Sequence, residues 1–175
     1  MSYIIGIDLA LANTGVAVFD TRSNCILELT TVKTEKTKQI RDLLQRCKLL
    51  FSDLLDILNS YPIDNTTTFV VEIPGGSQSS SAATAMSSAV GVYAGLNTLF
   101  SDSKYIHVGP KAIKSFVGNF SVEGSKRKNL NISKAEECFP SAPFLRNNKN
   151  VILRNQEHVC DAALLVALFL QGKAK

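Results

Sequence analysis

The spacing of hydrophobic positions at the start of the chain is typical of β-strands. Residues 3–8 form an apolar run rich in isoleucine, as in a buried strand. A turn is expected over residues 12–15, whose Asn-Thr-Gly sequence suits a change of chain direction. Second and third strands are expected at residues 16–20 and 25–32. These segments predict an antiparallel meander.

Residues 37–60 carry the clearest helical pattern in the sequence. Apolar side chains recur there at intervals of three and four residues, which places them on one face of a helix. Tyr61 and Pro62 mark the end of this helix, because a residue before proline disfavours helical backbone. Residues 67–73 then form an apolar, β-branched run that is typical of a central strand.

The remainder of the chain continues to alternate between helix and strand. A loop of small residues at 74–81 comes first, and the basic residues at 123–128 are also expected in a loop. The other expected elements are a helix at 82–100, a strand at 104–108, and helices at 111–117, 132–139 and 156–171. The order βββ-α-β-α-β-α-α-α predicts an α/β domain with a mixed sheet and helices on its faces.

Length and composition favour one folded domain spanning residues 1–175. Hydrophobic residues make up 45% of the chain and charged residues 19%, which is enough for a full core. No apolar run approaches the roughly 20 residues that a membrane span needs, and no secretory signal is recognisable at the N-terminus. We therefore expect a cytoplasmic protein with no membrane partner, in the host-cell cytoplasm if the source is viral.

Positive charge is concentrated in one part of the sequence. Residues 104–154 contain ten Lys or Arg and three Asp or Glu, a local balance of +7 in a chain whose net charge is +4. Such asymmetry indicates an anionic partner, although an ordinary solvated surface is the alternative. The residues expected to contact nucleic-acid phosphates are Lys111, Lys114, Lys126, Arg127, Lys128 and Lys134.

Two acidic residues lie at the ends of expected apolar strands. Asp8 closes the first strand, and Glu72 lies near the C-terminal end of the strand at 67–73. An ionised carboxylate in such a place is costly unless it is paired, protonated or bound to a cation. Asp8 could instead cap a turn, and Glu72 could be a structural ion-pair partner. Ligand sites of open α/β sheets nevertheless lie at the C-terminal ends of strands.

Asp161 is a third acid in an apolar setting, on a helix that is hydrophobic nearly all round and therefore expected to be buried. His158 and Glu157 precede it by three and four residues, so both can share its side of the helix. His158 could also be a helix cap or a packed surface residue. Its place beside a buried acid favours a role in a site.

A divalent metal explains all three acids together. Carboxylates repel one another in a low-dielectric pocket, and Mg²⁺ or Mn²⁺ removes that repulsion. Two such ions can activate a water and stabilise the leaving oxygen of a phosphodiester. Asp8, Glu72, His158 and Asp161 are thus the candidate catalytic and metal-binding residues, with His158 either a ligand or a proton carrier. The sequence has no phosphate-binding glycine motif, so we expect no nucleotide cofactor.

These residues, in this order, resemble the RuvC family of Holliday-junction resolvases in the RNase H-like superfamily. The resemblance covers nearly the whole chain. It rests on Gly6-Ile7-Asp8 with Gly15, Val71-Glu72, His158-x-x-Asp161-Ala162, and the segments 89–94 and 110–118. Family members can carry an aromatic residue shortly after the strand glutamate, but residues 73–77 contain none.

The resemblance implies an RNase H-like (ribonuclease H-like) fold, a five-stranded mixed sheet with order βββαβαβα and flanking helices. It also implies a homodimer that makes paired nicks in four-way DNA junctions with Mg²⁺, for which Mn²⁺ can substitute. It carries over Asp8, Glu72, His158 and Asp161 to the metal site and Lys114 to phosphate contact. Three alternatives stay open: a related nuclease for other branched, flap or single-stranded DNA, a catalytically silent DNA-binding module, and an actin-like ATPase, for which the chain is short.

Overall fold

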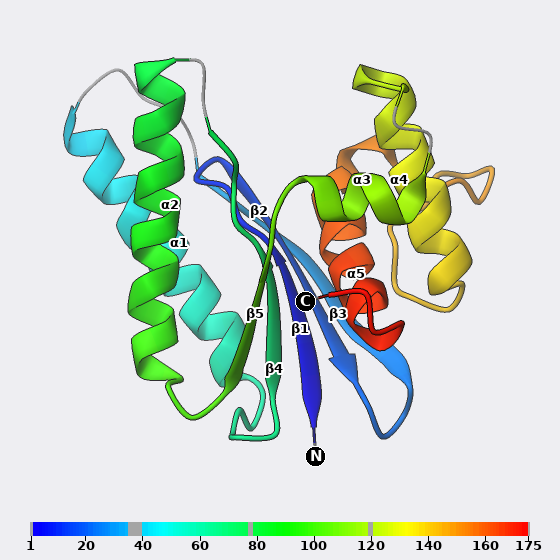
Figure 1. Cartoon of the computed structure of the whole chain (residues 1–175), viewed down its shortest axis with the longest axis horizontal. Coiled ribbons are helices and arrows are strands. Elements are labelled where there is room, and N and C mark those ends of the chain that lie inside the picture. Colours follow the sequence, from blue (N-terminus) through cyan, green and yellow to red (C-terminus); the bar gives the residue numbers. More distant parts are fainter. Residues whose placement is uncertain (1, 35–39, 77–78, 119–120, 175) are drawn as a thin grey trace.

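A computed structural model describes residues 2–34, 40–76, 79–118 and 121–174 of the protein. Its elements follow the predicted order (Figure 1). They are β1 (Tyr3–Asp8), β2 (Asn13–Asp20), β3 (Cys25–Lys33), α1 (Ile40–Asn59), β4 (Thr68–Glu72), α2 (Ser80–Leu99), β5 (Lys104–Val108), α3 (Lys111–Val117), α4 (Gly124–Cys138), the 3-10 turn η1 (Arg154–Gln156) and α5 (Glu157–Leu170).

The five strands form one mixed sheet in the order β3-β2-β1-β4-β5. The pairs β1–β2 and β2–β3 are antiparallel, as expected of a meander, whereas β1–β4 and β4–β5 are parallel. The parallel pairs need crossover connections, and α1 and α2 provide them. The prediction of a five-stranded mixed sheet is confirmed.

Helices cover both faces of the sheet (Figure 1): α1 and α2 lie on one face, and α3, α4 and α5 lie on the other. Alternate residues of β1 serve the two cores, as the two-residue period of a strand requires. Ile5 and Ile7 pack in the core beneath α1 and α2. Ile4 packs in the opposite core, and Gly6 lies against Ala162 of α5. Asp8 continues the second series, so it belongs to the face that α5 covers.

Helix α5 is the central buried helix of its layer. Nine of its residues are buried, including the unbroken run from Ala162 to Leu168. It packs closely because two glycines of the β1–β2 hairpin make room for its backbone. A β-carbon at Gly6 would overlap the carbonyl oxygen of Ala162, and one at Gly15 would overlap that of His158. Despite this apolar helix, the described residues contain no helix both long and apolar enough to cross a membrane.

Two sequence predictions are corrected by the structure. The residues expected to form a turn at 12–15 are mostly in β2, which begins at Asn13; the reversal lies earlier, where the Thr14 hydroxyl donates to the Ala10 carbonyl oxygen at 2.5 Å. The basic residues expected in a loop at 123–128 are largely in the first turns of α4. Lys and Arg are good helix formers, so their charge did not oppose a helix there.

Some predictions fall outside the described residues. They are the start of the first helix at residue 37 and residues 77–78 of the loop after β4. In the described part of the chain, α1 continues to Asn59, close to its predicted end at residue 60. The predicted loop ends two residues earlier than expected, because α2 begins at Ser80.

Candidate functional site

Asp8 and Glu72 are direct neighbours across the parallel β1–β4 pair. The register places the Cα of Asp8 opposite that of Glu72, each at the last residue of its strand. Both residues are partly buried. Strand alternation directs both toward the α5 face. Ile4 precedes Asp8 by four residues and Val70 precedes Glu72 by two, and both pack in the core of that layer. Two acids are thus brought together at the C-terminal edge of the sheet.

His158 joins this pair from the first turn of α5. Its Nδ1 lies 2.9 Å from Oδ2 of Asp8, and the two side chains are 26% and 17% exposed. The hydrogen bond to Asp8 is the main cause that raises the pKa of His158 above its usual value, although burial acts against it. The contact depends on the close approach of α5 to Gly15, which lies opposite Asp8 in the β1–β2 register.

The electrostatics of Glu72 indicate how closely the acids are grouped. Its pKa is raised to about 8, mainly by burial and also by the negative charges of Asp8 and Asp161. The positive charge of Lys114 acts in the opposite direction. Glu72 therefore experiences two acids and one lysine from three other elements, and a cation bound there would relieve the repulsion.

Asp161 lies one turn after His158 on α5. Its pKa is raised to about 7, mainly by burial and also by the negative charge of Asp8. A hydrogen bond from Asn131 of α4, with Nδ2 2.8 Å from Oδ1 of Asp161, opposes the shift. Asp161 is therefore a partly buried acid with an uncharged donor.

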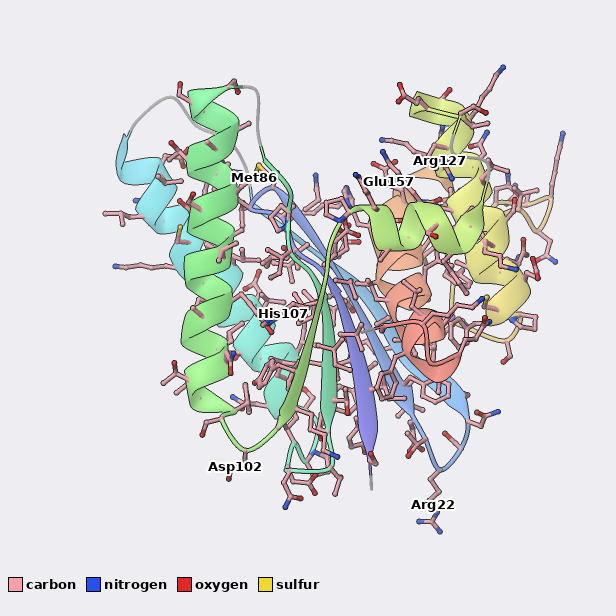
Figure 2. The ribbon with its side chains drawn as sticks, in the orientation of Figure 1. Arg22, Met86, Asp102, His107, Arg127 and Glu157 are labelled. Carbon is pink, nitrogen blue, oxygen red and sulfur yellow. The ribbon has the colours of Figure 1, made fainter. Side chains whose placement is uncertain are left out.

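Helix α4 supplies a second contact to the beginning of α5. Nζ of Lys128 lies 2.6 Å from Oε2 and 2.8 Å from Oε1 of Glu157, so the ammonium bridges both carboxylate oxygens. Oε1 of Glu157 is also 3.5 Å from Nε2 of His158. Figure 2 shows Glu157 at this end of the molecule and Asp102 at the opposite end. Sequence reasoning identified Glu157 as a neighbour of His158 but missed Asn131, which has no motif to mark it.

Two solved structures with the same architecture are RuvC structures. RuvC of Thermus thermophilus in complex with a Holliday junction substrate aligns with a TM-score of 0.67 and 15% sequence identity, over 100% of this chain and 99% of that one. A second T. thermophilus RuvC structure gives a TM-score of 0.67 and 13% identity, over 99% and 98%. The chain has the RuvC fold, which is RNase H-like.

Sequence comparisons do not extend this structural likeness. No protein-family profile matches the chain. No curated protein matches it either. The similarity to RuvC is therefore one of fold over the full chain length, at an identity of 13–15%.

The side chains of Asp8, Glu72, His158 and Asp161 offer donor atoms that suit a hard divalent cation. Three carboxylates and an imidazole are available, and two of the carboxyl groups have pKa values raised by burial and by neighbouring negative charge. Among the described residues, no three His, Cys, Asp or Glu side chains are already close enough around one point to hold an ion. The Asp8 carboxylate is instead directed at His158. The residues fit a metal by the chemistry of their donor atoms.

The basic residues of this protein that are predicted to contact phosphates differ in exposure and in their partners. Lys111, Lys114 and Lys126 are exposed, and Lys114 is close enough to affect the pKa of Glu72. Lys128 is half exposed but bridges Glu157. Lys134 pairs with Glu137 at 2.7 Å and lies 5.8 Å from the Phe116 ring centroid.

Arg127, predicted to contact phosphates, makes hydrogen bonds within the protein. The residue is buried, with only 8% of its surface exposed. Nε donates to the carbonyl oxygen of Val122 at 3.1 Å, and Nη1 donates to that of Gly118 at 2.7 Å. Arg127 therefore links α4 to the backbone at Gly118 and Val122; Figure 2 shows its place on α4. Its sequence neighbours Lys126 and Lys128 remain on the outside.

Proposed function

We propose that the protein is a metal-dependent endonuclease that cuts branched DNA, and four-way junctions in particular. The observation that supports this most strongly is the meeting of Asp8, Glu72, His158 and Asp161 at the C-terminal edge of the sheet. These side chains come from β1, β4 and α5, and the pKa values of Glu72 and Asp161 are raised mainly by burial and also by the negative charge of Asp8. Such a set is expected to bind cations rather than to stabilise the fold.

In the proposed site, Asp8, Glu72 and Asp161 would hold Mg²⁺, with Mn²⁺ as a substitute, and His158 would complete the set as a ligand or a proton donor. Two bound ions would supply an activated water and stabilise the leaving oxygen of a phosphodiester. The protein's own contribution is orientation. Asp8 holds the imidazole of His158 at 2.9 Å, and the raised pKa favours the protonated ring, which can donate a proton.

Exposed lysines would supply the expected contacts with DNA. Lys114 lies near Glu72, while Lys111 and Lys126 are exposed on α3 and α4. Lysine contacts to backbone phosphates give affinity without reading base sequence, as recognition of DNA shape requires. The solved RuvC complex with a Holliday junction substrate makes the four-way junction the first substrate to test.

Paired nicking of a four-way junction needs two active sites, which a two-fold symmetric homodimer would provide. Light scattering at micromolar concentration tests this part of the proposal. A mass of about twice the 19.0 kDa chain is expected. A monomeric protein would contradict symmetric paired nicking, while leaving a nuclease for flaps or other branched DNA as the better description.

The activity is tested by incubating the protein with labelled four-way, flap and linear duplex DNA, in Mg²⁺ and in EDTA. We expect Mg²⁺-dependent cuts in the four-way junction. Asp8→Asn should reduce the rate by at least about 100-fold, because loss of a direct ligand should exceed the effect of losing an outer-shell partner. Asp102→Asn is the matched control, since Asp102 is exposed at the opposite end of the molecule (Figure 2).

The outcomes separate the candidate functions. Cleavage of flaps but not of junctions would favour the related branched-DNA nuclease. Tight DNA binding without cleavage in Mg²⁺ or Mn²⁺ would favour a silent binding module. Cleavage that survives Asp8→Asn would show that the site is elsewhere.

A further inference from the structure

We infer that Asn131 is a positioning residue of the proposed metal site, holding the carboxylate of Asp161 for the cation. This inference rests on the proposed function and adds a residue to it. The bond is direct: Nδ2 of Asn131 donates to Oδ1 of Asp161 at 2.8 Å across the α4–α5 interface. This bond uses Oδ1 of Asp161, so the second carboxylate oxygen is left available to a ligand.

The position of Asn131 follows from a regular pairing of α4 with α5. Lys128 and Asn131 are three residues apart on α4, so they lie on one face of that helix. Their partners Glu157 and Asp161 are four residues apart on α5, again on one face. Helix α4 thus contacts both acids that flank His158, one through a charged donor and one through a neutral donor.

The amide orientation shows that the contact is directed at a carboxylate. The nitrogen of Asn131 faces Asp161, because an amide oxygen turned toward a carboxylate oxygen would be repelled. The amide oxygen is consequently left buried, with no hydrogen-bond partner in the described part of the chain. A buried acceptor without a partner is costly, and such atoms recur at functional sites. A hydrated cation at Asp161 would bring O–H donors to this acceptor.

The fold does not depend on this amide. Ile132 and Ala135 of α4 are buried in the core that includes α5, and they bind the two helices together by apolar contact. Replacement of a buried amide by an apolar side chain of similar volume removes the orphaned oxygen as well as the donor, so its cost to stability can be small. Loss of the amide should therefore weaken metal binding if Asn131 positions Asp161, and should lower stability if Asn131 serves only in packing.

The test measures Mn²⁺ binding to the whole protein, without DNA, by electron paramagnetic resonance. Asn131→Leu and the smaller Asn131→Ala should each weaken Mn²⁺ binding by about tenfold or more, the usual effect of losing an outer-shell partner, and should alter the spectrum of bound Mn²⁺. Their melting temperatures in EDTA should stay close to that of the natural protein. Asn129→Leu is the control, because Asn129 is exposed on the same helix.

Unchanged Mn²⁺ affinity in the variants would overturn the inference and leave the metal site intact. If Asn131→Leu fails to fold, Asn131→Ala decides the question, since it introduces no larger group. Asp161→Asn distinguishes failure of the inference about Asn131 from failure of the proposed metal site. Mn²⁺ binding that is absent, or that survives Asp161→Asn, would refute the proposed site itself and Asn131 with it.

Discussion

His158 and Asp8 are 150 positions apart in the chain, yet Nδ1 of one lies 2.9 Å from Oδ2 of the other. The contact connects the first turn of α5 to the end of β1. It orients the imidazole and uses one carboxylate oxygen of an acid proposed to bind metal. His158 is therefore positioned both to reach a cation and to compete with it for Asp8.

His158→Asp discriminates between the two roles of this residue. If His158 is a ligand, an aspartate supplies an oxygen donor in its place, and we expect a measurable fraction of the junction-cleavage rate to remain. His158→Ala, which has no donor, should lose at least about tenfold more. The measurement is single-turnover cleavage in Mg²⁺. Complete loss in both variants would contradict the ligand role and favour proton transfer.

The metal-free protein should become less stable as the pH rises from about 5 to about 8.5. The pKa values of Glu72, Asp161 and His158 are all raised in the folded state, to about 8 and about 7 for the two acids. Each group therefore binds a proton more tightly folded than unfolded, and the free energy of unfolding falls as these protons leave. For His158, stabilisation is complete below its unfolded pKa and is lost as the pH passes its raised folded value.

Calorimetry in EDTA across this range tests the sign of the effect. Asp161→Asn should flatten the decline, because that group no longer titrates. Mn²⁺ should raise the melting temperature more at about pH 8 than at about pH 6, since protons compete with the cation for the same groups. A melting temperature that rises with pH in the absence of metal would refute the burial-driven shifts.

Lys114→Ala should weaken junction binding and reduce the slope of log affinity against log salt by about 1, because one phosphate contact is lost. Lys114 is exposed and close enough to Glu72 to lower its pKa, so its ammonium lies where a bound phosphodiester is expected. Fluorescence anisotropy in EDTA at several salt concentrations measures the slope. Lys48→Ala, an exposed position on α1, is the control; equal slopes for both variants would argue against the contact.

Gly15→Ala should destabilise the protein by about 3 kcal/mol or more, since the added β-carbon would overlap the backbone of His158 and overpacking of this kind commonly costs 1–3 kcal/mol. Urea denaturation measures the loss. Gly76→Ala is the matched control, because a β-carbon there meets nothing within 4 Å. Similar stability of the two variants would mean that α5 can move away from the hairpin at little cost.

Sequence reasoning predicted the acidic residues because each interrupts an apolar segment. The two-residue period of strands then determines the face: Asp8 and Glu72 fall in the same series as Ile4 and Val70, beneath α5. The full element order was predicted for the same reason, since strands and apolar helices carry strong patterns.

The contributions of α4 could not be predicted in this way. Only Arg127, Ile132 and Ala135 are buried among its residues, so its periodicity is weak. Arg127 is buried between the exposed Lys126 and Lys128 because it donates to backbone carbonyl groups, which no sequence motif records. Asn131 likewise acquires its significance from Asp161, 30 positions later. Tertiary contacts assign these roles.

The close packing of α5 on the β1–β2 hairpin has a consequence for the order of events in folding. Gly6 and Gly15 admit a helix that follows them by about 150 residues, so the four side chains converge only after a very long loop has closed. Asp8 and Glu72 meet through the pairing of β1 with β4, but His158 and Asp161 join them only where α5 docks on the sheet. Assembly of all four residues therefore requires the last helix of the fold.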